Sequence, residues 1–230
     1  MKIYIFKSLL FLVVSYLLPI GLSAQSYIIK KTNGESLIYD YKDIESIIYS
    51  ENKEGVYEFV DLGLSVKWAT CNVGASTPEE YGKYFAWAEK TTKESYGFDN
   101  CITDNKEMTD FAGNIEYDVA AAEWGGSVRM PTKEECDELV YNCTWEETTE
   151  NGVLGMRVIG VNGNSIFFPA AGYYFGSELL YTGEAGYFWT TVPFEEGNSH
   201  AYYLAFYNKN SWTHHNYRGN GYTIRPISVK

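Results

Sequence analysis

The sequence predicts an α+β domain that follows a small β unit. Two segments indicate helices: residues 117–124 contain three alanines, and residues 129–140 carry a helix-start pattern. From Gly152 onward, apolar and aromatic residues alternate with polar ones between Gly, Asn and Pro, which is typical of strands. A chain of 230 residues suffices for one well-buried domain and a small appendage.

Residues 1–24 have the pattern of a secretory leader. Lys2 and Lys7 precede an apolar run at residues 8–20, and small residues then lead to a cleavage site after Ala24. The run is short for a membrane anchor, although an uncleaved anchor is the alternative. We expect an exported protein, periplasmic, extracellular or on the cell surface, with no transmembrane segment after cleavage.

Residues 25–50 predict a small β unit. Two apolar runs flank Asn33-Gly34, a pair that favours a tight hairpin turn, and residues 44–49 supply a third strand. Residues 51–56 are polar and are expected to form a linker. The main domain is expected to span residues 57–230.

The first part of the main domain predicts two strands and a short helix. Residues 58–62 and 65–70 are strand-like around Gly63. The run Thr77 to Tyr81 places a capping hydroxyl, a proline and two acids at a helix start. Residues 83–87 are expected to be extended.

Two further helices are predicted in the middle of the chain. The first covers residues 117–124 and ends at Gly125. The second begins after Thr132, because Thr132 and Glu135 have the spacing of a capping box. Its buried face is expected to carry Cys136, Leu139, Val140 and Cys143.

The rest of the domain predicts strands. Asn162-Gly163 is a second hairpin signal, and residues 208–210 favour another turn. The expected strands are residues 153–161, 165–168, 187–191, 201–207, 211–216 and 221–227.

Four cysteines in an exported chain favour two disulfides. At ~1.5 Å per residue, seven helical residues separate Cys136 and Cys143 by about 10 Å along the axis. That is too far for them to bridge each other. Each would therefore pair with Cys71 or Cys101, and we favour Cys71–Cys143 with Cys101–Cys136.

The main domain carries a series of motifs. The first is Val60-Asp61-Leu62-Gly63-Leu64-Ser65-Val66-Lys67-Trp68-Ala69-Thr70-Cys71-Asn72-Val73-Gly74-Ala75. Further segments follow in this order: Pro78-Glu79-Glu80-Tyr81-Gly82, Tyr84-Phe85-Ala86-Trp87, Trp124-Gly125-Gly126, Arg129-Met130-Pro131-Thr132, Asn142-Cys143-Thr144-Trp145, Phe168-Pro169-Ala170-Ala171-Gly172 and Ile224-Arg225-Pro226-Ile227. These motifs and their order resemble a known family of exported Bacteroidetes proteins, the Fibrobacter succinogenes-type major paralogous domain family.

This resemblance implies a C-type-lectin-like fold in its formylglycine-generating-enzyme variant. The expected domain is irregular and loop-rich, with two to three short helices and twisted antiparallel sheets. Cys101 and Cys136 look like additions to the family pattern, so their pairing with each other is inferred from this chain alone.

Catalysis is not expected. An oxidase of the formylglycine-generating type needs reactive cysteines in the C-terminal half, and no cysteine follows Cys143. No Gly-x-Ser-x-Gly elbow is present. The adjacent His214 and His215 would point to opposite faces of a strand and could not chelate one ion together. We therefore expect a protein that is not an enzyme and that has no cofactor.

A metal site is not expected either. Asp99-Asn100, Asp104-Asn105 and Asp110 place oxygens in one segment, but without EF-hand spacing. The formal net charge of -12 also argues against nucleic-acid partners, since the chain would repel phosphates.

The ligand-binding candidates lie beside predicted turns. Aromatic rings can stack on sugar faces while amides bind hydroxyls. The candidates are Trp212, Asn216, Tyr217, Tyr181 and His214, and packing within loops is their alternative role. Arg225 is expected to make a structural ion pair or an aromatic stack.

Two functions follow as hypotheses. The first is an exported, non-catalytic recognition module with glycans as its expected ligands. The second is a structural or protein-interaction component of the bacterial surface that docks a partner through the edges of residues 25–50. The sequence does not indicate an oligomeric state.

Overall fold

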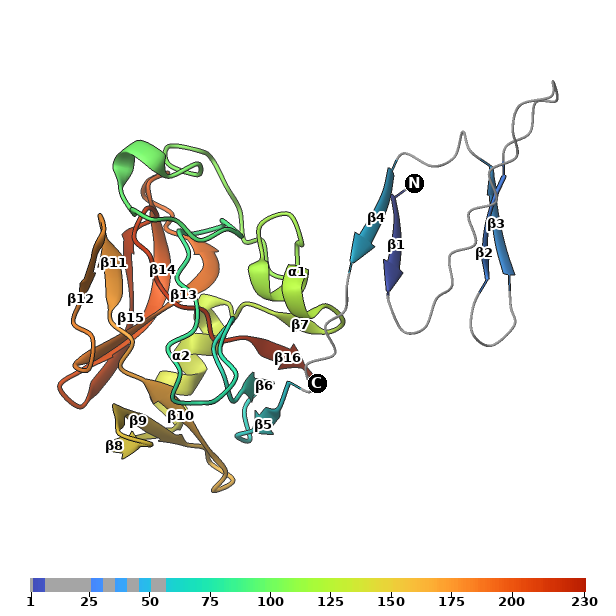
Figure 1. Cartoon of the computed structure of the whole chain (residues 1–230). Coiled ribbons are helices and arrows are strands. Elements are labelled where there is room, and N and C mark those ends of the chain that lie inside the picture. The colour runs from blue at the N-terminus through green and yellow to red at the C-terminus, as the bar shows by residue number, and fades with distance from the viewer. Residues whose placement is uncertain (1, 7–25, 31–35, 41–45, 51–56) are drawn as a thin grey trace. The chain divides into compact units, whose positions relative to one another are not determined.

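The computed structural model describes residues 57–230 in full (Figure 1). Before residue 57 it describes the backbone of four strands, at residues 2–6, 26–30, 36–40 and 46–50. Contacts divide the chain into two units, Met1–Lys53 and Glu54–Lys230.

The predicted N-terminal hairpin is confirmed. Strands β2 (Ser26–Lys30) and β3 (Ser36–Asp40) pair antiparallel, with Ile28 opposite Ile38. The turn at Asn33-Gly34 lies outside the described residues. Lys30 pairs with Ser36, so the register of the two strands differs by one residue from that of a two-residue turn at Asn33-Gly34.

The predicted third strand forms but pairs elsewhere. Strand β4 (Ser46–Ser50) lies parallel to β1 (Lys2–Phe6), not beside the β2–β3 hairpin. Strand β1 falls within the segment predicted to be a leader. The leader's apolar run at residues 8–20 and its cleavage site after Ala24 lie outside the described residues.

The main unit is built from four small antiparallel sheets. One has the order β5 (Phe59–Asp61), β6 (Val66–Ala69), β16 (Ile227–Val229) and β7 (Val128–Arg129). The second has the order β10 (Ser165–Pro169), β9 (Val153–Ile159) and β8 (Thr144–Glu150), and the third the order β13 (Ala185–Pro193), β14 (His200–Tyr207) and β15 (Asn210–Tyr217). The fourth is the hairpin of β11 (Tyr173–Phe175) and β12 (Glu178–Leu180).

Helix α2 (Lys133–Asn142) confirms the strongest helix prediction. The Thr132 hydroxyl accepts from the backbone N–H of Glu135, and the Glu135 carboxylate accepts from the N–H of Thr132. The predicted capping box is therefore formed. Cys136 and Leu139 are buried, as their spacing predicts.

The predicted fold class is wrong. Among the described residues, α2 is the only helix of ten residues, α1 (Val119–Trp124) has six, and Phe98–Asn100 forms a single 3-10 turn. Strands dominate the domain, so it is mainly β, not the α+β, C-type-lectin-like arrangement with two to three helices. Strands β8, β11 and β12, which the sequence did not predict, account for part of this difference.

The predicted helix at Thr77 to Tyr81 does not form. The segment makes one turn, in which the N–H of Glu80 donates to the carbonyl of Thr77 at 3.2 Å. Gly82 follows with a φ of +76°, which leaves the helical region. The residues that favour a helix start therefore form only a single turn, because the backbone leaves the helical conformation at Gly82.

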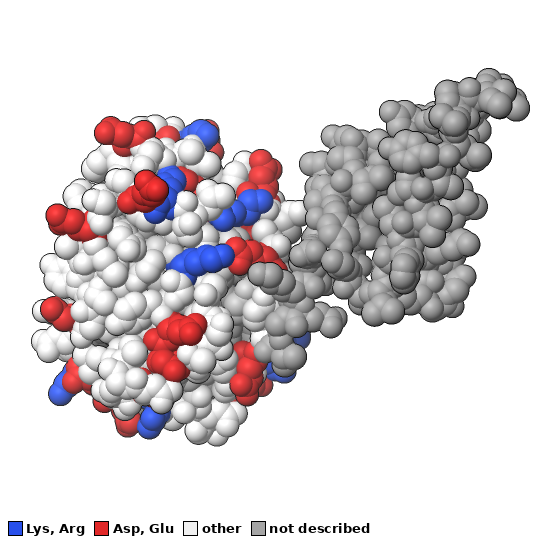
Figure 2. Space-filling view, in the orientation of Figure 1, with Lys and Arg blue, Asp and Glu red and all other residues white. Residues whose placement is uncertain are grey.

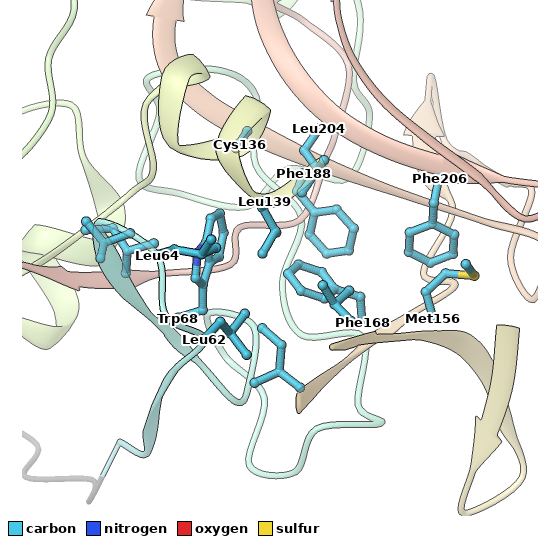
Figure 3. Packing of buried hydrophobic residues seen from close by; sticks show 14 of the residues in the cluster. Leu62, Leu64, Trp68, Cys136, Leu139, Met156, Phe168, Phe188, Leu204 and Phe206 are labelled. Carbon is cyan, nitrogen blue, oxygen red and sulfur yellow. The ribbon is translucent and has the colours of Figure 1, made fainter. Parts of the chain in front are cut away.

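The main hydrophobic cluster lies between α2 and three sheets (Figure 3). Leu139 from α2 points toward Trp68, Phe168 and Phe188, which come from β6, β10 and β13. The rings of Phe168 and Phe188 meet edge to face at 5.1 Å. Because these residues come from distant parts of the chain, this cluster holds the sheets together.

A second cluster fills the opposite side of the β13–β15 sheet. It includes Trp87, Trp189 and Tyr222, all buried, and the rings of Trp189 and Tyr222 stack at 4.2 Å. Much of the aromatic C-terminal stretch is therefore core. In the part of the chain that the structure describes, no helix is both long and apolar enough to cross a membrane.

Candidate functional site: a tyrosine face beside an edge strand

The β14–β15 hairpin sets the register of the candidate site. Its two-residue loop, Asn208 and Lys209, has φ values of 47° and 66°, as a primed turn requires. The turn predicted at residues 208–210 is therefore confirmed in place but is one residue shorter, because Asn210 already belongs to β15. The pairing that follows runs without a shift from Tyr207 opposite Asn210 to His200 opposite Tyr217.

This register places aromatic side chains in rows across the β13–β15 sheet. One row is Tyr187, Ala205 and Trp212, and the next is Trp189, Tyr203 and His214. Since neighbours in a row share a face, these side chains stand on the same side of the sheet. The opposite side carries Phe188 and Leu204, which pack in the cluster beneath α2.

The β11–β12 hairpin adds two further rings to this side. Tyr173 lies 4.9 Å from Tyr187 and 6.1 Å from Tyr181, measured between ring centroids. Tyr181 lies 6.3 Å from Tyr207. We call this surface the tyrosine face and define it by Tyr173, Tyr181, Tyr187, Tyr203, Tyr207 and Trp212.

The tyrosine face is partly exposed. Tyr181 and Tyr207 are 48% and 44% exposed, whereas Tyr203 is buried. Tyr181 has a φ of 56°, an uncommon value for a residue that is not glycine, which sets its ring beside that of Tyr173. The view in Figure 2 shows uncharged residues over much of the main unit and no gathering of Lys and Arg on the visible side.

Burial controls the protonation of the phenols. It raises the pKa of Tyr187 to about 12 and also raises the pKa values of Tyr173 and Tyr203. Tyr173, Tyr187 and Tyr203 are therefore protonated at neutral pH and can donate hydrogen bonds.

The polar neighbours are partly committed within the protein. The Asn216 amide donates to the Tyr222 hydroxyl at 2.9 Å, and its oxygen accepts from the N–H of Tyr217. His214 is exposed, and its Nδ1 lies 2.9 Å from the carbonyl oxygen of His215. The side-chain amide and oxygen of Asn216 therefore hold Tyr222 and Tyr217 in place, which leaves little of its hydrogen-bonding capacity for a ligand.

Four of the five predicted ligand residues lie on or beside this face. Trp212, His214 and Asn216 share one side of β15, and Tyr181 joins them through Tyr173 and Tyr207. Tyr217 does not join them, because it stands on the other side of β15, is 5% exposed and stacks on Phe98 at 3.8 Å. The sequence analysis missed Tyr173, Tyr187 and Tyr207. Tyr207 shares the side of Trp212 because the loop has two residues and Tyr207 pairs with Asn210, whereas the sequence predicted a turn over residues 208–210.

Arg225 is a structural residue. It is fully buried, its Nε donates to Asn72 at 2.8 Å, and its Nη1 donates to the carbonyls of Ala69 and Thr70. Its guanidinium lies 4.4 Å above the Phe168 ring, so the predicted aromatic stack is confirmed. Burial lowers its pKa to about 9, and its Nη2 has no hydrogen-bond partner.

The predicted disulfides are absent from the structure. All four cysteines are free. Cys136 is buried in the cluster beneath α2, whereas Cys101 lies 3.6 Å from the Thr103 hydroxyl, so the two contact different parts of the fold. Burial raises the pKa of the Cys136 thiol and raises that of Cys143 to about 11, so both stay protonated at neutral pH.

Two open pockets lie elsewhere on the described part. One, of about 440 Å³, is lined by Glu107 to Ala112, Asn114 and Tyr117, and the other, of about 460 Å³, includes Tyr84, Tyr96 and Tyr174. Within residues 57–230, no group of three or more His, Cys, Asp or Glu side chains is arranged to hold a metal ion.

A protein-family model matches residues 129–227, and its description is a domain of unknown function (DUF8237). The matched segment contains α2, the β8–β10 sheet and the entire tyrosine face. No curated protein and no solved structure matched the chain.

Proposed function

We propose that this chain is an exported, non-catalytic recognition module that binds glycans through the tyrosine face. The observation that carries the proposal is the connected set of rings on this face, two of which are about half exposed. Aromatic rings pack well on the C–H faces of sugar rings, and protonated phenols can donate to sugar hydroxyls.

The experiment is a glycan array with the chain purified after export. Tyr181→Ala and Tyr207→Ala should each weaken binding about 2–10-fold, as expected for one lost ring contact of about 0.5–1.5 kcal/mol. Tyr141→Ala is the matched control, since Tyr141 is a 78% exposed tyrosine on α2 that is not part of the tyrosine face. Absence of any glycan ligand for the wild-type chain would sink the proposal.

A second candidate is a surface component that docks a partner through residues 25–50. The two-stranded β2–β3 sheet supports this candidate, because it belongs to the unit Met1–Lys53, which is distinct from the main domain. Deleting residues 25–50 should abolish co-purification of the partner while the main domain keeps its melting temperature. Unchanged co-purification would contradict this candidate.

A further inference from the structure

Strand β15 is an edge strand with unpaired backbone groups. It pairs with β14 only, and the N–H of Arg218 donates to the carbonyl of Ser199. Hydrogen-bonded pairs alternate along an antiparallel ladder, so the N–H and C=O groups of Ser211, Thr213 and His215 point away from β14. Among the described residues, no backbone group bonds to these outward groups, and the one side-chain contact is His214 Nδ1, 2.9 Å from the His215 carbonyl oxygen.

Strand β15 itself lacks most of the usual protections against pairing, although helix α2 contacts it and the Thr213 hydroxyl donates to Asp137 of that helix. Edge strands are commonly blunted by charges, prolines, bulges or short length. Strand β15 has eight residues, contains no charged residue and no proline, and pairs without a register shift. By contrast β8, the edge of its own sheet, carries Glu146, Glu147 and Glu150.

The absence of charge matters in a chain with a net charge of -12. Two copies that approach through most of their surface repel each other, whereas β15 itself carries no charged side chain, and the Asp137 carboxylate beside Thr213 is paired with Lys133. We propose that β15 pairs antiparallel with β15 of a second copy, which joins the two three-stranded sheets into one. This proposal goes beyond glycan binding and does not depend on it.

The outward groups determine the register of this pairing. Thr213 lies opposite its own symmetry mate, and Ser211 lies opposite His215 of the second copy, so that each such pair exchanges two N–H···O bonds. Trp212 then lies opposite His214 of the second copy, on the side of the tyrosine face. Both tyrosine faces would lie on one side of the joined sheet, which suits a multivalent ligand.

The first test is the mass of the purified exported chain in analytical ultracentrifugation over a concentration series. The weight-average mass should rise toward that of two chains. A single-chain mass up to about 1 mM, where even weak complexes form, would overturn the proposal. If β15 instead accepts an unrelated extended peptide, the chain alone stays monomeric and the proposal is equally wrong.

Two variants localise the contact. Ser211→Pro removes an outward N–H that is not bonded to β14, so it should weaken the dimer at least tenfold, whereas Ser211→Ala keeps the N–H and should leave the dimer intact. Far-UV circular dichroism and the melting temperature check that Ser211→Pro is folded. A dimer of unchanged strength in folded Ser211→Pro would refute pairing through β15.

A charge exchange tests the register without relying on proline. His214 is exposed, and in the proposed register it lies about 7–8 Å from His214 of the second copy, a diagonal neighbour. His214→Lys and His214→Glu should each weaken self-association, and an equimolar mixture should restore it as a heterodimer at low salt. Failure of the mixture to associate more strongly than either variant would overturn this register.

Discussion

The carboxylate of Asp118 connects three segments, so replacing it should be among the most destabilising single changes. It is fully buried and accepts hydrogen bonds from the N–H groups of Gly113, Ala121 and Met130 at 2.9–3.2 Å. It also caps the N-terminus of α1.

Asp118→Ala leaves the N–H groups of Ala121 and Met130 buried without a partner, whereas water can reach the exposed Gly113. Each such orphan costs about 1–3 kcal/mol, but the variant also removes a buried negative charge, which offsets part of the loss. We expect the free energy of unfolding to fall by about 3–5 kcal/mol. Urea denaturation of wild type, Asp118→Ala and the exposed control Asp99→Ala measures it.

The difference in the free energy of unfolding between wild type and Asp118→Ala should also depend on pH. Burial raises the pKa of the Asp118 carboxyl above its usual 3.8 despite the opposing backbone hydrogen bonds. The protonated form is therefore favoured by folding, so this contribution is complete below pH 3.8 and is lost as pH rises through the folded pKa. The difference between wild type and Asp118→Ala should thus shrink from acid to neutral pH. A difference below about 1 kcal/mol, or one that grows with pH, would refute the reasoning.

Three further predictions concern the core, a turn and the thiols. Leu139→Ala, which empties space beneath α2, should lower the free energy of unfolding by about 2–5 kcal/mol in urea, and a loss under 1 kcal/mol would contradict the packing in Figure 3. Gly172→Ala should lower Tm by several degrees, because Gly172 has a φ of +63° and a Cβ there would meet the Leu180 carbonyl; a Tm equal to wild type would contradict this strain. A thiol reagent at neutral pH should label Cys136 only after urea unfolding, and rapid labelling of the native chain at Cys136 would contradict its burial.

The elements that the sequence predicted well are those determined by neighbouring residues. The capping box of Thr132 and Glu135 starts α2 because both partners lie within one turn. The β14–β15 hairpin follows from Asn208 and the alternation on either side of it. In both cases the required hydrogen bonds form between residues that are close in the chain.

The sequence analysis failed where distant segments compete for backbone partners. Strand β8 carries three glutamates and has little strand pattern, yet it pairs along its full length with β9. Residues 221–227 were predicted as a strand, but Tyr222 and Thr223 form only isolated bridges, to Phe85 and Phe188, and the strand begins at Ile227. These outcomes depend on contacts that no local window contains, and they made the domain mainly β.

The candidate site shows the same division. Alternation along β15 alone places Trp212, His214 and Asn216 on one side of a strand. The tertiary structure decided that β11 and the Tyr181 turn complete this surface, that Tyr217 is buried on the opposite side, and that β15 lies at an edge. Local periodicity determines which way a side chain points, whereas the burial of apolar area between distant segments determines what it meets there.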